Sequence, residues 1–447
     1  MTTEYKLNEF RAMVDPDKGL VDRKIFYDPD IYQMELEQIF ARSWLFMCHE
    51  SQIPNPGDFF LSNMGEDRVI IVRNNEGGIS VLVNSCRHRG NAVCRADEGH
   101  ATSFMCTYHG WTYDLTGALV GVPGFKEVYH EELDRENWGL IKAAQVDSYK
   151  GLVFANMDAN APSLDEWLGV GGKLGLDIFC DRYHEMKAFP GIIKFQMNCN
   201  WKFPSDNSPD QYHGGFTHAS AVIAGHNTGS DPGRLRNRRG FGGVQPNAGI
   251  TVIEEYGHGF NSVYLPDNWS EVTAGKPLDQ WVKYQEQPTK DGKPTKLGRI
   301  NMNVFPNLFV ATSGSNIALR VPKGPTSTEI WIWSCYDGKS ADDVRNLQRQ
   351  RSESHFGPSG LFEQEDGENW DQSTAGTRGT VSSRYPLNYA MSIKHGEVLH
   401  QEGTAPRVET HMNEHAQLWT YRAWADFMAA KDWDELRANH SIPEGFV

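Results

Sequence analysis

The window "CRHRGNAVCRADEGHATSFMCTYHGW", residues 86–111, holds three cysteines and three histidines and limits the fold of this chain more than any other feature. Cys86 and His88 are two residues apart, Cys106 and His109 are three apart, and seventeen residues separate the two pairs. Each pair can present two ligands from one tight loop. The long gap can hold strands that bring the loops together, so we expect a fold that closes two loops on one metal centre.

The order of the ligands distinguishes two kinds of metal site. Zinc fingers typically use a cysteine pair followed by a histidine pair on a helix. Here each pair contains one cysteine and one histidine, with Gly90 or Gly110 just beyond. This order suits a [2Fe-2S] cluster in which two cysteines hold one iron and two histidines hold the other. The stretch resembles the Rieske family, whose motif is C-x-H, seventeen residues, C-x-x-H, and it matches that motif completely.

Cys94 and His100 lie inside the window but outside the motif. A buried thiol and a solvated loop imidazole are the ordinary roles of such residues, so we assign them no ligand role. Respiratory-chain Rieske proteins carry an extra cysteine in each cluster loop, whereas this chain has Arg87 and Tyr108 within its loops. The resemblance is therefore to the soluble oxygenase or ferredoxin branch.

The chain is too long to be a ferredoxin alone. A Rieske domain accounts for only about a quarter of its 447 residues, so something else must use the electrons. The net charge of −15 argues against nucleic acid or an anionic membrane as a partner. The start "MTTEYKLNEF" lacks the regions of a signal peptide, no run approaches a membrane span, and seven cysteines fit a reducing compartment. We expect a cytoplasmic enzyme.

Three segments are predicted along the chain. Residues 1–40 contain most of "DPDIYQMELEQIFARSW" (28–44), a helix that Asp28 can cap with Pro29 in its first turn, and we expect this segment to pack with the catalytic domain. Residues 41–157 contain "RVIIVR" and "ISVLVN" joined by "NNEGG", which predicts a hairpin in an all-β domain. Residues 158–447 mix strands such as "EIWIWSCYD" with a final helix that has an apolar stripe, which predicts an α+β domain.

A glycine-rich stretch, "GVGGKLG" at 169–175, lacks the spacing of a nucleotide-binding motif and is predicted to be a loop. We therefore expect no site for NADH, flavin or ATP in this chain. Electrons must then arrive from another protein.

A second constellation is "NWKFPSDNSPDQYHGGFTHAS", with Asp210, His213 and His218. A mononuclear iron that activates O2 requires two imidazoles, one carboxylate and open positions. Histidines five apart do not share a face of a regular helix, so we expect a bend or π-bulge there. A further carboxylate can come from "LFEQEDGENWDQ", where chemistry alone does not choose among Glu363, Glu365, Asp366, Glu368 and Asp371.

With these residues the resemblance extends over the whole chain. It is similar to the large, catalytic subunit of Rieske non-heme iron aromatic-ring-hydroxylating dioxygenases, such as the naphthalene and biphenyl enzymes, whose second motif is D-x-Y-H followed by a second His. The resemblance implies that His213 and His218 bind Fe(II), with Asp366 as the third ligand and Glu365 as its nearest rival. It also implies that Asp210 is an electron-transfer bridge, joining His213 to His109 of a neighbouring copy.

The same resemblance implies the fold and the reaction. The catalytic domain would be built on an antiparallel sheet of the helix-grip type. A ferredoxin, reduced by an NADH-dependent reductase, would deliver electrons, and both atoms of O2 would add to an aromatic hydrocarbon to give a cis-dihydrodiol. A small beta subunit would complete an α3β3 hexamer. The alternatives are a Rieske monooxygenase acting on an aromatic acid, and an electron carrier without catalysis.

The substrate pocket is also implied by the resemblance. Its apolar character favours a bicyclic or larger hydrocarbon, although Arg299 leaves an acid substrate open. Asp206 stands where the naphthalene-type enzymes commonly carry Asn. We expect His411 and His415 to be surface or packing residues and the other histidines, among them His258 and His355, to be structural. The predicted pocket residues are Asn207, Gly214, Val222, Asn301, Phe356 and Phe362.

Overall fold

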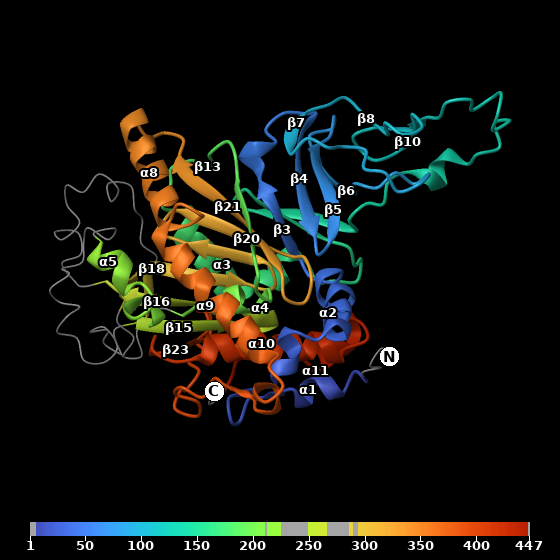
Figure 1. Ribbon diagram of the computed structural model, residues 1–447. Coiled ribbons are helices and arrows are strands. Elements are labelled where there is room, and N and C mark those ends of the chain that lie inside the picture. The colour runs from blue at the N-terminus through green and yellow to red at the C-terminus, as the bar shows by residue number, and fades with distance from the viewer. Residues whose placement is uncertain (1–5, 211, 225–248, 266–285, 289–293, 446–447) are drawn as a thin grey trace. The chain divides into compact units, whose positions relative to one another are not determined.

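The computed structural model describes residues 6–210, 212–224, 249–265, 286–288 and 294–445. The chain divides into two compact units (Figure 1), one of residues Phe40–Leu164 and one that combines Met1–Ile39 with Asp165–Val447. The predicted fold class, an all-β domain with a larger α+β domain on an antiparallel sheet, is confirmed. Among the described residues, no helix is both long enough and apolar enough to cross a bilayer.

The smaller unit consists of three sheets. Their strand orders are β6-β5-β4-β7, β10-β9-β8 and β11-β12-β3. The predicted hairpin is present: Arg73 pairs with Ile79, and the Asn74 side chain accepts hydrogen bonds of 3.0 Å from two N–H groups of the turn. The strands are β3 Leu45–His49, β4 Asp58–Met64, β5 Asp67–Arg73, β6 Ile79–Val83, β7 Glu98–His100, β8 Phe104–Met105, β9 Thr112–Tyr113, β10 Leu119–Gly121, β11 Gln145–Tyr149 and β12 Leu152–Asn156, and 3-10 turns span Glu50–Gln52 and Arg135–Trp138.

The N-terminal helix begins as the sequence predicts. Asp28 caps α2 (Pro29–Glu35) by accepting hydrogen bonds from the N–H groups of Asp30 and Ile31, at 2.9 and 3.2 Å. A π-helical turn, Leu36–Phe40, follows at once. The preceding elements are α1 Glu9–Ala12, β1 Val14–Asp15, β2 Leu20–Val21 and a 3-10 turn at Arg23–Phe26.

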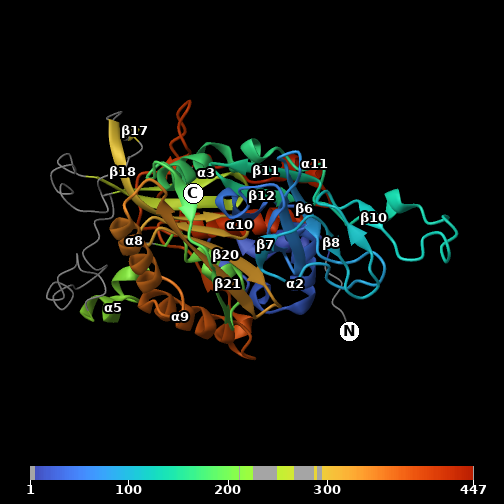
Figure 2. The same ribbon diagram turned by 90° about the horizontal axis from the view of Figure 1, so that it is seen from above.

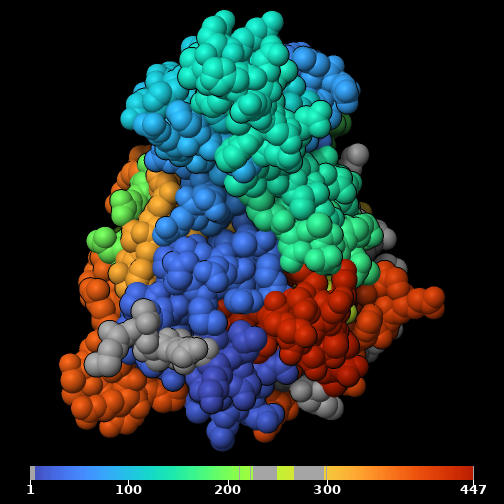
Figure 3. Space-filling view, turned by 90° about the vertical axis from the view of Figure 1, so that its right-hand side faces the viewer, coloured from blue at the N-terminus to red at the C-terminus, as the bar shows by residue number. Residues whose placement is uncertain are grey.

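A buried carboxylate ties α2 to the rest of the larger unit. Glu35 is fully buried and accepts hydrogen bonds from Lys202 Nζ at 2.5 Å, from Trp201 Nε1 at 2.8 Å and from Trp424 Nε1 at 2.7 Å. A buried charge is tolerable only when it is paired in this way. The N-terminal residues and the last helices consequently share one face of this unit (Figure 3).

The larger unit is built on a ten-stranded antiparallel sheet. Its main order is β13-β21-β20-β19-β18-β16-β15-β23, with β14 paired to β21 and β17 paired to β18. The strands are β13 Met186–Ala188, β14 Ile193–Met197, β15 Gly249–Glu254, β16 His258–Tyr264, β17 Glu286–Pro288, β18 Pro294–Val304, β19 Leu308–Ala311, β20 Asn316–Pro322, β21 Thr328–Asp337 and β23 Arg407–Val408.

Helices cover both faces of this sheet (Figures 1 and 2). The pairing register places Asn303, Phe309 and Ala318 on one face of the sheet, and the helices α8, α9 and α10 lie along that face. Phe260 and Met302 lie on the other face, against helix α3. The remaining elements are α3 Leu164–Cys180, α4 Lys202–Asp206, a 3-10 turn at His213–Gly215, α5 Ala219–Ile223, a 3-10 turn at Glu255–Gly257, α8 Asp342–His355, α9 Leu361–Thr377, a 3-10 turn at Ser382–Arg384, β22 Leu387–Asn388, α10 His415–Ala429 and α11 Trp433–Asn439.

The prediction of a loop at 169–175 is wrong, because this stretch lies inside α3. Only Gly169 leaves the helical conformation, with φ 59° and ψ −168°, and it kinks the helix. At Gly171 a Cβ would lie 2.9 Å from Val252 Cγ1, and at Gly175 it would overlap the Met302 side chain. The glycines therefore let α3 approach the sheet closely, a tertiary reason that the local sequence does not reveal.

Candidate metal centres

The two predicted cluster loops have the same backbone conformation. In the first loop, the Gly90 N–H donates to Cys86 O at 2.8 Å; in the second, the Gly110 N–H donates to Cys106 O at 2.8 Å. Gly90 and Gly110 have φ of 75° and 76°, a conformation that favours glycine. The loops follow β6 and β8, so the strands present two equivalent turns, each carrying one cysteine and one histidine.

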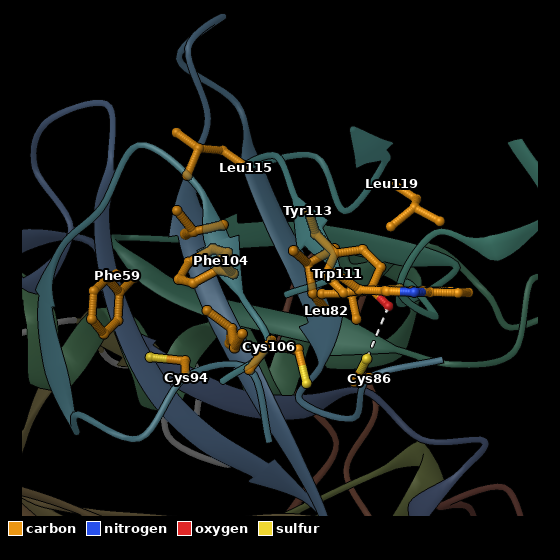
Figure 4. Packing of buried hydrophobic residues seen from close by; sticks show 14 of the residues in the cluster. Phe59, Leu82, Cys86, Cys94, Phe104, Cys106, Trp111, Tyr113, Leu115 and Leu119 are labelled. Atoms are coloured by element: carbon orange, nitrogen blue, oxygen red, sulfur yellow. Dashed lines mark hydrogen bonds between the residues drawn. The ribbon is translucent and has the colours of Figure 1, made fainter. Parts of the chain in front are cut away.

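The two cysteines face one another in a buried site (Figure 4). Cys86 Sγ lies 3.3 Å from Tyr113 Oη, and Asn91 Nδ2 lies 3.6 Å from Cys106 Sγ. Burial alone would raise the pKa of Cys106, but hydrogen bonds from the Tyr108 N–H, Asn91 and Cys86 lower it below its usual value. Donors aimed at a sulfur stabilise a thiolate, which is the form that binds iron.

The two histidines also converge. The ring centroids of His88 and His109 are 4.5 Å apart, and His88 stacks on Trp111 at 5.2 Å. Within the described chain, His88 Nδ1 is buried without a hydrogen-bond partner. Burial and the neighbouring His109 lower the pKa of His88, which keeps its ring neutral and able to coordinate a metal. This arrangement fits a cluster with two sulfur and two nitrogen ligands.

The other two residues of the window lie away from this set. The Cys94 thiol is buried and lies 3.7 Å from Ala96 O, on the Phe59 side of the core in Figure 4. The exposed His100 ring contacts Asp58 at 2.9 Å. All seven cysteines are free thiols.

The second site lies in the larger unit, where a short segment meets α9. His213 begins a 3-10 turn and His218 precedes α5, so the break in the helix that the spacing required is present. Asp366 lies on the inner side of α9. One ligand atom from each of these three residues lies within 4.8 Å of the others, which is close enough for one metal ion to contact all three.

The orientation of these side chains suits one cation. Asp366 Oδ1 lies 3.5 Å from Nε2 of both His213 and His218. The opposite ring nitrogens face other carboxylates, because His213 Nδ1 lies 3.3 Å from Asp210 and His218 Nδ1 lies 3.0 Å from Glu365. Carboxylates behind metal-binding imidazoles fix their tautomer and orientation. Two imidazoles and one carboxylate form the facial set used by mononuclear iron that reacts with O2.

The electrostatics of the site also favour a cation. Burial alone would lower the pKa of His213, but Asp210 and Asp366 raise it to about 9. Burial raises the pKa of Asp366, and the two histidines offset only part of that increase. Asp366 Oδ1 is buried and accepts no hydrogen bond from the described residues. A metal ion between the three side chains would replace the proton that His213 otherwise holds and would pair with the Asp366 carboxylate.

A cavity of about 130 Å³ opens beside His213, His218 and Asp366. Five of the six predicted pocket residues line it, and the side chain of Val222, like that of Arg299, lies outside the described residues. The sequence interpretation missed three lining residues. Phe309 lies on the face of β19 that points toward the cavity. Ser313 and His355 belong to no alternating pattern in the sequence, and the sequence predicts a structural role for His355. The predicted lining residues are Asn207, Gly214, Asn301, Phe356 and Phe362.

Other histidines occupy structural positions. His258 is buried, with Nε2 2.8 Å from Trp167 O and Nδ1 accepting from the Phe305 N–H at 3.1 Å. His411 and His415 are also buried, so they are packing residues rather than surface ones. Asp206 does not line the cavity; its carboxylate faces Tyr389 and Tyr421 instead.

Known families match both units of the chain. The Rieske [2Fe-2S] domain matches residues 43–143, and the catalytic domain of the ring hydroxylating alpha subunit matches residues 173–428. These matches, with the His-His-Asp cluster, confirm a [2Fe-2S] cluster and a mononuclear iron as the cofactors of the chain.

Similar proteins agree with these matches. The alpha subunit of benzene 1,2-dioxygenase from Pseudomonas putida is 35% identical over 97% of this chain and 96% of its own. The alpha subunit of biphenyl 2,3-dioxygenase from Rhodococcus jostii (strain RHA1) is 36% identical over 96% of this chain and 93% of its own. The structure of naphthalene 1,2-dioxygenase from Rhodococcus sp. bound to indole superposes with a TM-score of 0.79 and 30% identity, covering 97% of this chain and 100% of that one.

All three proteins are dioxygenases, which supports dioxygenation over the monooxygenase alternative. The second metal site, in a matched catalytic domain, contradicts an electron carrier without catalysis. The chain belongs to the Rieske non-heme iron aromatic-ring-hydroxylating dioxygenases, as a catalytic alpha subunit.

Proposed function

We propose that Cys86, His88, Cys106 and His109 hold the [2Fe-2S] cluster and that His213, His218 and Asp366 hold the mononuclear iron. The observation that carries the second assignment is the position of Asp366 Oδ1, 3.5 Å from Nε2 of both histidines at the wall of a cavity. When bound, the cluster supplies electrons and the iron activates O2, so that both oxygen atoms add to adjacent carbons of an aromatic ring.

Glu365 has a different role in this proposal. Its Oε2 lies 3.0 Å from His218 Nδ1, and its other oxygen accepts a hydrogen bond from Ser220. It therefore orients the His218 ring from behind, as Asp210 does for His213. The chain's own residues thus fix both imidazoles with Nε2 directed at Asp366.

The proposed substrate is an aromatic hydrocarbon of two or more rings. Phe309, Phe356 and Phe362 supply flat apolar walls, and His355 lies over Phe362 with ring centroids 5.1 Å apart. Asn207, Asn301 and Ser313 add polar groups. The three phenyl rings can position an aromatic ring in a cavity whose other lining residues are mostly polar. Relatives named for biphenyl and naphthalene support this substrate class.

We infer that the electrons come from a ferredoxin served by an NADH-dependent reductase, as the membership of the ring-hydroxylating dioxygenases implies. A small beta subunit and an α3β3 assembly are part of the same proposal. So is a cytoplasmic location, in which the seven free thiols would remain reduced.

Product analysis tests the function directly. The oxygenase, supplied with electrons and ¹⁸O2, is offered benzene, biphenyl, naphthalene, phenanthrene and benzoate, and the products are examined by mass spectrometry. We expect cis-dihydrodiols carrying two labelled oxygens, with the bicyclic and tricyclic arenes preferred over benzene. A product with one labelled oxygen, or turnover of benzoate alone, would contradict the proposal.

A further inference from the structure

We propose that Asp206, Tyr389 and Tyr421 form a proton-holding site behind the mononuclear centre, and that the charge on Asp206 positions Asp210 and, through it, His213. This inference rests on the proposed function and deepens it, because it assigns a role to the residue at which the chain departs from the Asn of the naphthalene-type enzymes. Asp206 acts through Asp210 and is therefore a positioning residue.

The geometry of the site is the first argument. Asp206 is the last residue of α4, which contacts α10 (Figure 1). Its Oδ2 accepts hydrogen bonds from Tyr389 Oη at 2.7 Å and from Tyr421 Oη at 2.5 Å, and the two hydroxyls are 3.2 Å apart. The three groups come from distant parts of the chain and meet on one carboxylate oxygen. A side chain held from two sides in this way is fixed in place.

The neighbouring charges are the second argument. Asp210, Glu414 and the cation Arg320 all lie close enough to Asp206 to interact with its charge. Arg320 is engaged elsewhere, with Nη1 donating to Asn303 at 2.8 Å and Nη2 donating to Ser208. Three carboxyl groups so close together repel one another when all are ionised. One proton among them relieves that repulsion.

Asp206 is the member of this group placed to take the proton. Glu414 accepts hydrogen bonds from Tyr212 Oη at 3.1 Å and from the Met391 N–H at 2.9 Å, and Asp210 accepts from the N–H groups of Tyr212 and His213, both at 3.1 Å. Backbone donors of this kind favour an ionised carboxylate, and at Glu414 they offset part of the increase in pKa that burial causes. Asp206 has only hydroxyl donors, and these can rotate to accept a proton.

The acid strength of the group agrees with this assignment. Burial, together with Asp210 and Glu414, raises the pKa of Asp206 to about 7, even though the two tyrosine hydroxyls favour its ionised form. The pKa values of Tyr389 and Tyr421 lie well above the usual value, mainly because both are buried, so both remain protonated. Asp206 therefore gains or loses its proton near neutral pH.

The consequence reaches the metal site through one contact. When Asp206 is neutral, Asp210 meets one like charge fewer and is free to stay beside His213, where Oδ1 and Nδ1 are 3.3 Å apart. When Asp206 ionises, its charge repels Asp210. The orientation of the His213 ring, and the electron transfer that depends on Asp210, then vary with pH.

The decisive variant is Asp206→Asn, which keeps the shape and the acceptor oxygen but carries no charge at any pH. The first measurement is the pH dependence of thermal unfolding of the holoenzyme. A folded-state pKa raised from 3.8 to about 7 means that the wild type loses stability as pH rises from about 4 to about 7, while Asp206→Asn does not share this loss. The difference in melting temperature, variant minus wild type, should therefore increase between about pH 4 and about pH 7 and stay constant above that range.

A matched control is Asp337→Asn in the same unit. The pKa of Asp337 is lowered, because N–H and side-chain hydrogen bonds from His184 outweigh the effect of burial. Its stabilising effect is lost only as the pH falls below about 4, so the difference between Asp337→Asn and wild type should be flat between pH 5 and 8. A flat difference for Asp206→Asn over the same range would overturn the proposal.

The second measurement is the rate at which substrate and O2 reoxidise the reduced cluster, followed against pH. The wild type should show an inflection near pH 7 that Asp206→Asn lacks. Tyr421→Phe removes a donor that favours the ionised form, so its inflection should move to higher pH. An unchanged inflection in Asp206→Asn, or loss of its mononuclear iron, would refute the positioning role. If the proposed substrate chemistry were wrong, product analysis would fail at every pH while the unfolding difference remained.

Discussion

The cysteines of the smaller unit differ in what surrounds their sulfur atoms. Cys106 has a lowered pKa because N–H donors point at it, whereas burial raises the pKa of Cys94. Only a cysteine of the first kind is prepared to bind iron as a thiolate. Sequence spacing could identify Cys86 and Cys106 as a pair, because the Rieske motif is local and complete within one window.

The cluster ligands give the first prediction. Replacing Cys106 with Ser should abolish the visible absorption of the cluster and its EPR signal, since a hydroxyl is a poor substitute for a thiolate. Cys94→Ser is the control and should leave both signals intact, because the Cys94 thiol bonds to Ala96 O and is not a predicted ligand. An intact EPR signal in Cys106→Ser would contradict the assignment of the loops.

The third iron ligand gives the second prediction. Asp366→Ala should lower mononuclear iron content by about tenfold or more and keep the Rieske spectrum, because the two sites use separate residues. Glu365→Ala should keep most of its iron and react more slowly, since it removes only the partner of His218 Nδ1. Iron analysis separates the two, and the reverse result would move the ligand to Glu365.

The sequence could not choose between these two carboxylates on chemical grounds. They are adjacent on α9, and successive residues of a helix point in different directions around its axis. Asp366 is therefore directed toward both Nε2 atoms, and Glu365 is directed toward Nδ1 of His218. Only the resemblance to known enzymes favoured Asp366. The role of Glu365 required the three-dimensional position of His218, which comes from a different part of the chain.

Among the secondary-structure elements, α3 shows how tertiary packing can override local sequence preference. Its glycines predict a loop because each weakens an isolated helix by up to about 1 kcal/mol. In the fold, the Gly171 N–H donates to Glu254 Oε2 at 2.5 Å, and the helix lies too close to the sheet for side chains at these positions. By contrast, the hairpin of β5 and β6 and the cap of α2 were predictable, because their determinants are local.

The kink in α3 gives the third prediction. Gly169→Ala should destabilise the larger unit by about 1–3 kcal/mol, because φ 59° with ψ −168° is a glycine conformation and the new Cβ would lie 2.5 Å from Glu254 Cδ. Gly376→Ala, in α9, meets no atom within 4 Å and should stabilise by up to about 1 kcal/mol. Chemical denaturation measures both, and equal effects would show that packing of Gly169 is unimportant.

At the scale of the whole molecule, the cluster residues and the iron residues belong to different units. Asp210 is the residue that the family resemblance makes the bridge between an iron site and the His109 of a neighbouring subunit. Within this chain, Asp210 already accepts hydrogen bonds from the N–H groups of Tyr212 and His213 and lies 3.3 Å from the His213 ring. All of these contacts use Oδ1, and the proposed bond between subunits would use the second oxygen, Oδ2.

The bridge gives the fourth prediction. Asp210→Ala should keep both the EPR signal of the reduced cluster and the iron content, because Asp210 supplies a ligand to neither site. It should nevertheless slow reoxidation of the cluster by about 10- to 100-fold when substrate and O2 are added, since charge-assisted bonds that hold two imidazoles in register are lost. Asp210→Asn separates charge from shape: if an amide restores the rate, hydrogen bonding alone suffices. Normal single-turnover product from Asp210→Ala, or a fully active monomer by sedimentation, would refute the bridge and the ring of subunits together.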